Sequence, residues 1–276
     1  MRSDEKIYLL LAPLVLYILF FFLSPFGSAF KLAFFNDSGK FTLDYIVKTI
    51  KDVRFYSALK YTVLFVVTII PLQLVTAFVI ALYITRRGSS WLMFIVSIPL
   101  AISDLAAGLI FLSVFSESGF LNSFLYSLGL IKRPIYFLSY QNTWFLFLAV
   151  VLAEHWRATS IVLLILVAGL QMIEKDFHEA ARIFGAGFIK EIYFVTLPLL
   201  KPSIQSALII RTIFAFQMFA VVLALAGDMI PVLSGEAFFW YSLYRNPHIA
   251  SVYALIIILI SVFFTFVYLR VMRQEL

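Results

Sequence analysis

The sequence lacks cysteine altogether and contains only three histidines, so several kinds of chemistry are excluded at once. Without cysteine the chain can form no disulfide, no thiolate metal site and no cysteine nucleophile. Three histidines and 15 acidic residues also leave little material for a metal centre. We therefore expect no metal site in this chain.

Charged residues are scarce as well. They make up 13% of the 276 residues, whereas 63% are hydrophobic and the mean hydropathy is +1.02. Soluble domains carry about 25% charged and roughly 45–50% apolar residues. A soluble enzyme and a disordered chain are thereby excluded. The net charge of +6 comes without a basic run or a nucleic-acid-binding module, so we assign it to contacts with anionic lipids of the bilayer and expect no nucleic acid partner.

The sequence also lacks a Walker A motif for binding nucleotide phosphates. Its only Gly-Lys pair, Gly39-Lys40, has neither the preceding glycine nor the following Ser or Thr that the motif requires. The chain is therefore not expected to hydrolyse a nucleotide by that route.

Six apolar stretches are long enough to cross a bilayer, whose core of about 30 Å needs about 20 apolar residues per helix. We expect helices because the bilayer offers no partner for unpaired backbone groups, and the alternating pattern of a membrane barrel is absent. The fold class predicted is an all-α polytopic membrane protein with one transmembrane domain over residues 1–276. The expected spans are approximately 7–30, 61–85, 88–116, 134–170, 198–227 and 249–270.

The N-terminal segment resembles a secretory signal peptide, because Arg2 and Lys6 precede an apolar run. That run is longer than the 7–15 residues of a usual signal core, so we expect an uncleaved first helix. Basic residues divide almost evenly between the two sides of the predicted bundle, and charge counting alone does not orient the chain.

The most polar interruption in the second half of the chain lies at 171–197. Here Phe177, Ala180, Ala181 and Phe184 recur at helical spacing and form one apolar stripe on a short helix. Gly185 or Gly187 suits its C-terminal stop. Such a helix could lie on the membrane surface, or its small alanines could let a partner approach closely. Amphipathicity does not decide between these two interpretations.

Motifs in this loop resemble a known family. Glu179-Ala180-Ala181, followed by Gly185 and by Leu197-Pro198, has the spacing of the EAA signature of ABC importer permeases, with Val195 in place of the usual Ile. The stretch 168–171, AGLQ, resembles the same segment of carbohydrate permeases. The resemblance runs from about Leu43 to the C-terminus and is closest to the maltose- and glycerol-phosphate-type subfamily. Two positions depart from it: Phe184 stands where that subfamily has Asp, and 226–231 lacks its GGP.

The resemblance implies a permease subunit that moves a sugar through the plasma membrane. It implies that the 171–197 loop is cytoplasmic, between spans four and five, and contains a coupling helix that docks on a separate ATPase. The residues at this contact would be Glu179, Ala180, Ala181, Gly185, Phe177 and Phe184. Both termini would then be cytoplasmic.

The same resemblance implies several partners. They are a second permease subunit, two ATPase subunits, an extracytoplasmic sugar-binding protein and the sugar itself. The chain would not be an enzyme and would hold no cofactor, because ATP and Mg would bind in the ATPase subunits.

Four charged residues interrupt the predicted spans: Asp104, Glu154, Arg157 and Arg211. A charge inside a membrane costs a few kcal/mol or more, so each one suggests a functional site. The two acids and two bases could instead pair and hold helices together. Glu154 and Arg157 lie three residues apart, which places them on one helix face. Both interpretations stay open.

A sugar site needs aromatic faces and hydrogen-bonding groups that match hydroxyls. Spans four and five provide both, and several of these positions match path-lining positions of maltose-type permeases. The predicted substrate path consists of Glu154, Trp156, Arg157, Arg211, Phe214, Gln217 and Met218.

Two other functions compete with the ABC permease. A secondary transporter could use Asp104 and Glu154 as a proton relay and would need no ATPase. A structural or receptor-like membrane subunit would tolerate the loss of Glu179.

Overall fold

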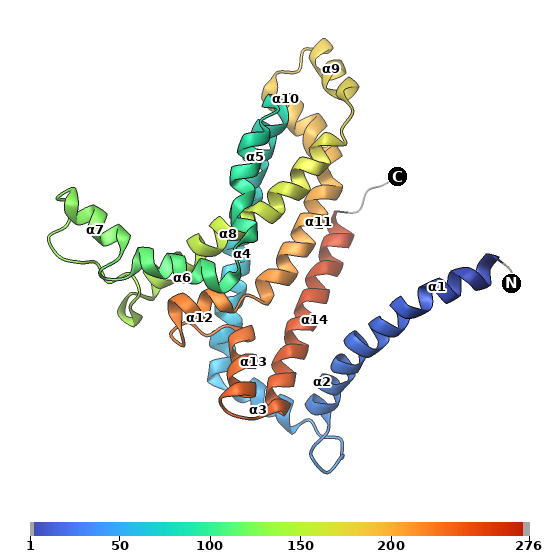
Figure 1. Ribbon diagram of the computed structural model, residues 1–276, viewed down its shortest axis with the longest axis vertical. Helices are drawn as coiled ribbons and strands as arrows, with labels where there is room; N and C mark the ends of the chain where they lie inside the picture. Colours follow the sequence, from blue (N-terminus) through green and yellow to red (C-terminus); the bar gives the residue numbers. More distant parts are fainter. Residues whose placement is uncertain (1–2, 273–276) are drawn as a thin grey trace. The chain divides into compact units, whose positions relative to one another are not determined.

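The computed structural model describes residues 3–272, with side chains from residue 10 onward, and it is predominantly helical (Figure 1). The ends of the predicted domain, residues 1–2 (which include Arg2) and 273–276, lie outside the described part. Among the described residues, six helical segments are long and apolar enough to cross a membrane, which confirms the predicted fold class. They are Leu10–Phe34, Val53–Arg87, Asp104–Ser127, Tyr140–Gln171, Phe188–Phe216 and Pro247–Val271.

The chain forms two compact units. The first contains the segment up to Ser57 together with Leu233–Leu259, and the second contains Ala58–Val232 together with the segment from Ile260 onward. The long helices α4 (Val53–Arg87) and α14 (Pro247–Val271) each contribute to both units.

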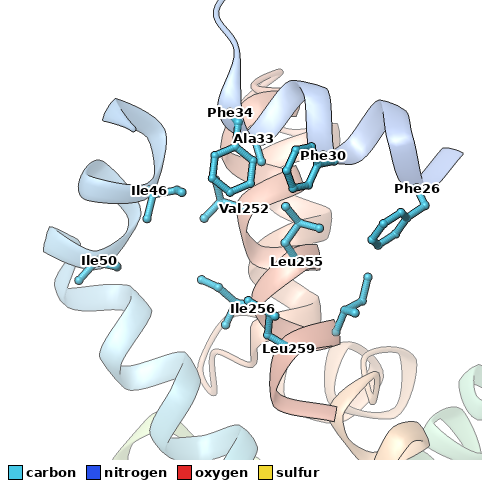
Figure 2. A pocket seen from close by; sticks show the side chains of 11 residues that line it. Phe26, Phe30, Ala33, Phe34, Ile46, Ile50, Val252, Leu255, Ile256 and Leu259 are labelled. Atoms are coloured by element: carbon cyan, nitrogen blue, oxygen red, sulfur yellow. The ribbon is translucent and has the colours of Figure 1, made fainter. Parts of the chain in front are cut away.

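The first unit contains the N-terminal helices and an apolar cavity of about 460 Å³ (Figure 2). Aromatic side chains of α2, including Phe30, face aliphatic side chains of α3 and α14, including Ile50 and Leu255, across this cavity. Apart from its share of α4 and α14, this unit contains α1 (Ser3–Ile18), a π turn (Leu19–Leu23), α2 (Ser24–Phe34), α3 (Asp44–Lys51) and α13 (Leu233–Ser242).

Two sets of polar contacts join helices of the first unit, one around Glu236 and one around His248. Arg54 donates to the buried carboxylate of Glu236, and burial raises the pKa of Glu236 above its ordinary value despite this partner. His248 hydrogen-bonds the Leu32 carbonyl at 2.8 Å through Nδ1 and Asp37 at 3.0 Å through Nε2. The His248 contacts tie the start of α14 to the end of α2 and the turn that follows it.

The second unit is built around α8 (Thr143–Gln171). In its span, 67% of the residues in an apolar 18-residue segment are buried, whereas the corresponding share is 33% or less in the other spans. Helix α8 is therefore the central helix of this unit. Around it are α5 (Ser90–Ser97), α6 (Asp104–Phe115), α7 (Phe120–Ser127), α9 (Lys175–Ile183), α10 (Phe188–Glu191), α11 (Leu197–Phe216) and α12 (Ala220–Ala226). A 3₁₀ turn (Ile98–Ala101), a second one (Tyr140–Asn142) and a π turn (Ile192–Thr196) connect some of these helices.

The segment 88–116, expected as one span, is divided into two helices that run in different directions (Figure 1). The break follows Pro99, which lacks a backbone donor, and it ends at Ser103, whose hydroxyl caps α6 by accepting from the Ala106 N–H at 3.2 Å. Asp104 is therefore the first residue of α6 rather than a mid-helix charge, and the helix dipole favours a carboxylate there.

The fifth span also differs from the expected 198–227. Its helix begins at Phe188, and a π turn precedes Pro198 and Pro202. The helical segment continues through both prolines without a break. It ends at Phe216, where Gln217 is the C-cap, and the chain continues into the separate helix α12.

Small residues let helices of the second unit approach closely. A Cβ placed on Gly169 of α8 would lie 2.1 Å from the Ser203 hydroxyl and 2.8 Å from Leu200 of α11. A Cβ on Gly108 of α6 would lie 2.6 Å from Ala224 of α12. At both positions side-chain atoms of the neighbouring helix occupy the space that a Cβ would need, so a larger residue would force them to shift. Small residues at helix contacts are a common device for packing membrane helices.

We expect Gly169→Ala to destabilise the protein by about 1–3 kcal/mol, because the added methyl group overpacks the contact between α8 and α11. The measurement is thermal unfolding of the purified chain in detergent. Gly187→Ala is the matched control, since nothing lies within 4 Å of its added Cβ. Adding Ser203→Gly to Gly169→Ala should recover part of the loss. Equal midpoints for the two alanine variants would contradict this packing.

Candidate functional site

The short helix expected in the 171–197 loop is present as α9. It lies outside the membrane-spanning candidates, between the span that ends at Gln171 and the one that begins at Phe188. Its C-terminal end is closed by a Schellman motif, in which the N–H of Ala186 donates to the carbonyl of Ala181 and that of Gly185 to Arg182, both at 2.9 Å. Gly185 has a φ of +77°, in the left-handed region that favours glycine. Of the two glycines considered as a stop, Gly185 is the one that ends the helix.

The apolar stripe of α9 is exposed. Phe184 is 90% exposed and Phe177 49%, while Ala180 is exposed and Ala181 is half-buried. Ile183, which the sequence pattern did not single out, adds to this surface with 83% exposure. Large apolar side chains that stay exposed outside the membrane spans are typical of a surface for another protein.

The opposite side of α9 carries polar side chains. His178 and Arg182 are four residues apart, so they share one helix face, and both contact the buried carboxylate of Glu191. Glu179, the acidic residue of the EAA signature, is exposed. The helix therefore has one face bonded to its own chain and one face open.

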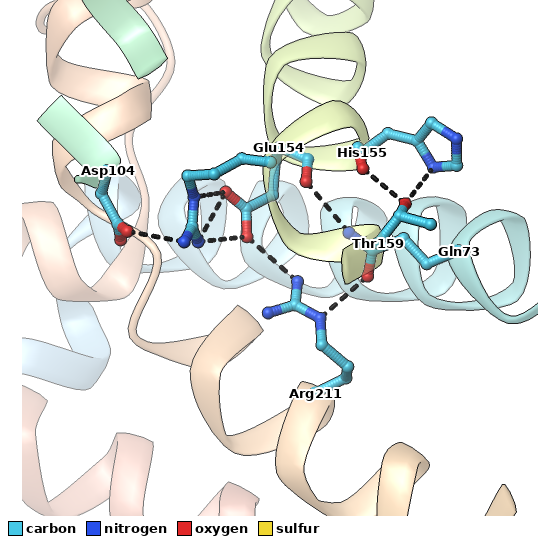
Figure 3. A network of polar contacts seen from close by, with 7 residues as sticks. Gln73, Asp104, Glu154, His155, Thr159 and Arg211 are labelled. Carbon is cyan, nitrogen blue, oxygen red and sulfur yellow. Dashed lines mark hydrogen bonds and ion pairs between the residues drawn. The ribbon is translucent and has the colours of Figure 1, made fainter. Parts of the chain in front are cut away.

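A network of charged and polar side chains lies in the second unit (Figure 3). Arg211 of α11 is fully buried and donates to Glu154 of α8 at 3.0 Å and to Gln73 of α4 at 2.8 Å. Arg157 donates to Glu154 at 3.1 Å and pairs with Asp104 of α6 at 3.0 Å. The two acids and two bases thus form one continuous, charge-balanced chain.

The network favours pairing between helices as the role of the four charged residues. It joins α4, α6, α8 and α11, and only its Asp104 end is substantially exposed, at 47% of the side chain. Gln73 was missed from the sequence, although it is the one strongly polar residue inside the 61–85 stretch apart from threonine. Arg211 Nη1 is buried and has no hydrogen-bond partner among the residues that the structure describes.

The remaining residues of the predicted path do not converge on the charged network. Trp156 lines a cavity of about 490 Å³ with His155, Thr159 and Phe111, whose ring centroid lies 5.7 Å from that of Trp156. Phe214 and Gln217 are exposed, and Met218 is buried in an apolar core cluster. His155, Thr159 and Phe111 were not assigned to the path from the sequence, because Phe111 lies on another helix and only the fold brings the three residues to one cavity.

The chain matches a known protein family over most of its length. Residues 73–274 match the family described as the inner membrane component of binding-protein-dependent transport systems. The chain is 31% identical to the trehalose/maltose transport system permease protein MalF of Thermococcus litoralis, over 99% of this chain and 95% of the relative. It is 30% identical to the lactose transport system permease protein LacF of Rhizobium radiobacter, over 78% and 74% of the two chains.

The fold agrees with these matches. A crystal structure of a bacterial alginate ABC transporter, in complex with an alginate pentasaccharide-bound periplasmic protein, contains a chain with a TM-score of 0.82 at 21% identity. The similarity covers 99% of this chain and 95% of that one. The protein described here belongs to the family of inner membrane components of binding-protein-dependent transport systems, and it is a multi-pass permease subunit.

The buried pair of Glu154 and Arg211 should show strong energetic coupling. Glu154→Leu leaves the fully buried Arg211 without an opposite charge, and we expect this variant to cost about 3–5 kcal/mol of stability. Arg211→Met should cost less, because Glu154 keeps its ion pair with Arg157. The double variant should lose clearly less than the sum, because Arg157 keeps Asp104 as a partner. The measurement is thermal unfolding in nanodiscs, with exposed Gln217→Ala as a control that should change little. Additive losses would contradict the pairing.

Proposed function

We propose that this permease subunit carries a sugar across the cytoplasmic membrane in an ABC importer driven by ATP hydrolysis in a partner subunit. The observation that supports the partner is the exposed apolar face of α9, which carries the EAA residues and lies outside the spans. The observation that supports the cargo is the set of relatives, which are named for trehalose, maltose and lactose transport.

The coupling contact is assigned to α9. Ala180 and Ala181 permit close approach of a partner backbone, and Phe177 and Phe184 supply apolar contact area. Exposed Glu179 is available for a charged contact, and Gly185 provides the turn at the end of the helix. A helix with these properties fits a groove on a separate ATPase, which would bind the ATP and Mg itself.

The coupling contact also sets the proposed orientation. If α9 faces the cytoplasm between spans four and five, both termini are cytoplasmic, because six spans bring the chain back to the side where it began. The chain carries one EAA helix, so two docking points on a pair of ATPase subunits require a second permease. An extracytoplasmic binding protein completes the assembly, in line with the periplasmic protein bound to the alginate transporter.

The translocation path is assigned to the surface around Trp156. The cavity there combines two aromatic rings with the polar groups of His155 and Thr159, which is the mixture that a sugar needs. We include Phe214 and Gln217 as exposed path residues of α11. In this proposal Glu154, Arg157 and Arg211 hold the helices that form the path, and Met218 supports it from the core.

Neither relative described above is named as a secondary transporter, and we do not propose the proton relay through Asp104 and Glu154.

A cross-linking experiment tests the coupling contact. Because the chain has no native cysteine, a thiol-specific linker can react with it only at an introduced cysteine. In the assembled transporter, Ala180→Cys should form an adduct with a nucleotide-hydrolysing subunit through a short bifunctional linker. Leu130→Cys, which is also exposed but lies in the loop after α7, should not. Phe184→Ala should lower ATP-driven uptake about tenfold or more, as expected for loss of an interface anchor.

The proposal fails if Ala180→Cys captures no nucleotide-hydrolysing subunit while Phe184→Ala leaves uptake intact. Comparing the amounts of each variant in the membrane separates a loss of coupling from a loss of protein.

A further inference from the structure

Glu191 is a buried carboxylate at the junction between the EAA loop and the fifth span. It is the last residue of α10, it is 3% exposed, and the π turn that leads into α11 begins directly after it. It falls inside the nine-residue spacer between Gly185 and Val195, so the EAA signature assigns it no role.

Three cationic or protonatable side chains from two other helices converge on Glu191. Arg86, in the last turn of α4, donates to Oε1 at 2.9 Å, and His178 of α9 contacts the same oxygen through Nδ1 at 2.9 Å. Arg182 of α9 lies 3.4 Å from Oε2. Because Arg86 and His178 share one oxygen atom, Glu191 links the end of α4 directly to α9.

Arg86 makes a second contact to the same short helix. Its guanidinium group lies over the ring of Phe188, 4.5 Å from the centroid, at the start of α10. The end of α4 therefore holds α10 at both of its terminal residues. A displacement of Glu191 would disturb both the ion pair and this cation–π contact.

Apolar packing alone does not fix α9, because Phe177 lines a cavity with Leu199 and Pro202 of α11 but stays 49% exposed. A cavity of about 530 Å³ lies beside Glu191 and is lined mostly by residues from α9 and from the ends of α4 and α8. Of the nine residues of α9, only His178 and Ala181 are not exposed. The bonds of His178 and Arg182 to Glu191 are therefore the main contacts that orient α9. A buried carboxylate is strongly destabilising without its partners, so these bonds are costly to break.

We propose that Glu191 is a positioning residue that fixes the direction of α9 relative to α4 and α11. A force on the exposed face of α9 would then reach α4 through Arg86 and α11 through the π turn. The transport role of this linkage rests on the proposed docking of α9 to an ATPase, whereas its structural role does not.

The structural part is tested on the full chain in nanodiscs without partner subunits. Spin labels at Ile183→Cys on α9 and Tyr83→Cys on α4 are both at exposed positions, in a chain with no native cysteine. Glu191→Gln should broaden the distance distribution between the labels, because the neutral amide loses the charge that three side chains share. Exposed, neighbouring Lys190→Gln is the matched control and should leave the distribution unchanged.

A second variant keeps the test decisive if Glu191→Gln does not fold. The double variant His178→Ala/Arg182→Gln removes the bonds between α9 and Glu191 but leaves Glu191 bonded to Arg86. It should broaden the same distance distribution. An unchanged distribution in the folded variants would overturn the proposal.

The functional part is measured in the assembled transporter. Glu191→Gln should lower the ratio of sugar imported to ATP hydrolysed at least about fivefold while the ATPase still co-purifies. Glu191→Asp, which keeps the charge, should restore part of this ratio. An unchanged ratio would overturn the transport role. If no ATPase binds the wild-type chain, the proposed function fails, and the label distances still decide the role of Glu191.

Discussion

A charged side chain buried among apolar helices needs an opposite charge, because neither hydrocarbon nor an apolar core can replace the water that it has lost. In the second unit this requirement brings together Arg211, Glu154, Arg157 and Asp104 from α11, α8 and α6, with Gln73 of α4 as a neutral partner. The same requirement acts at Glu191, where α4 and α9 meet. Charge pairing is therefore the constraint that sets how these helices are arranged.

Close backbone packing complements these pairs. Gly169 brings α8 against α11 near the loop that contains α9, and Gly108 brings α6 against α12. Charge pairs join the helices at a few defined points, and glycines allow the contacts between those points to be tight. An arrangement held at discrete points can move as rigid pieces, which is what alternating exposure of a transport path requires.

The spans and α9 were predictable from sequence because hydropathy and the spacing of Phe177 to Phe184 are local properties. The breaks at Pro99–Ser103 and at Gln217 were not, because both stretches are predominantly apolar and the break depends on a single proline, cap or polar residue. The four membrane charges were identified, whereas Gln73 was not, since its contact with Arg211 spans 138 positions. Glu191 looked like one of many charges in a polar loop, and only the fold shows that it is buried.

Reconstitution into proteoliposomes tests the central claim most directly. The vesicles would contain this chain with its second permease and ATPase, and uptake of radiolabelled maltose, trehalose and lactose would be followed with a binding protein on the opposite side from α9. The account predicts that uptake of at least one sugar requires ATP on the α9 side and persists when a protonophore collapses the proton gradient. Uptake that proceeds without ATP and stops with the protonophore would contradict it.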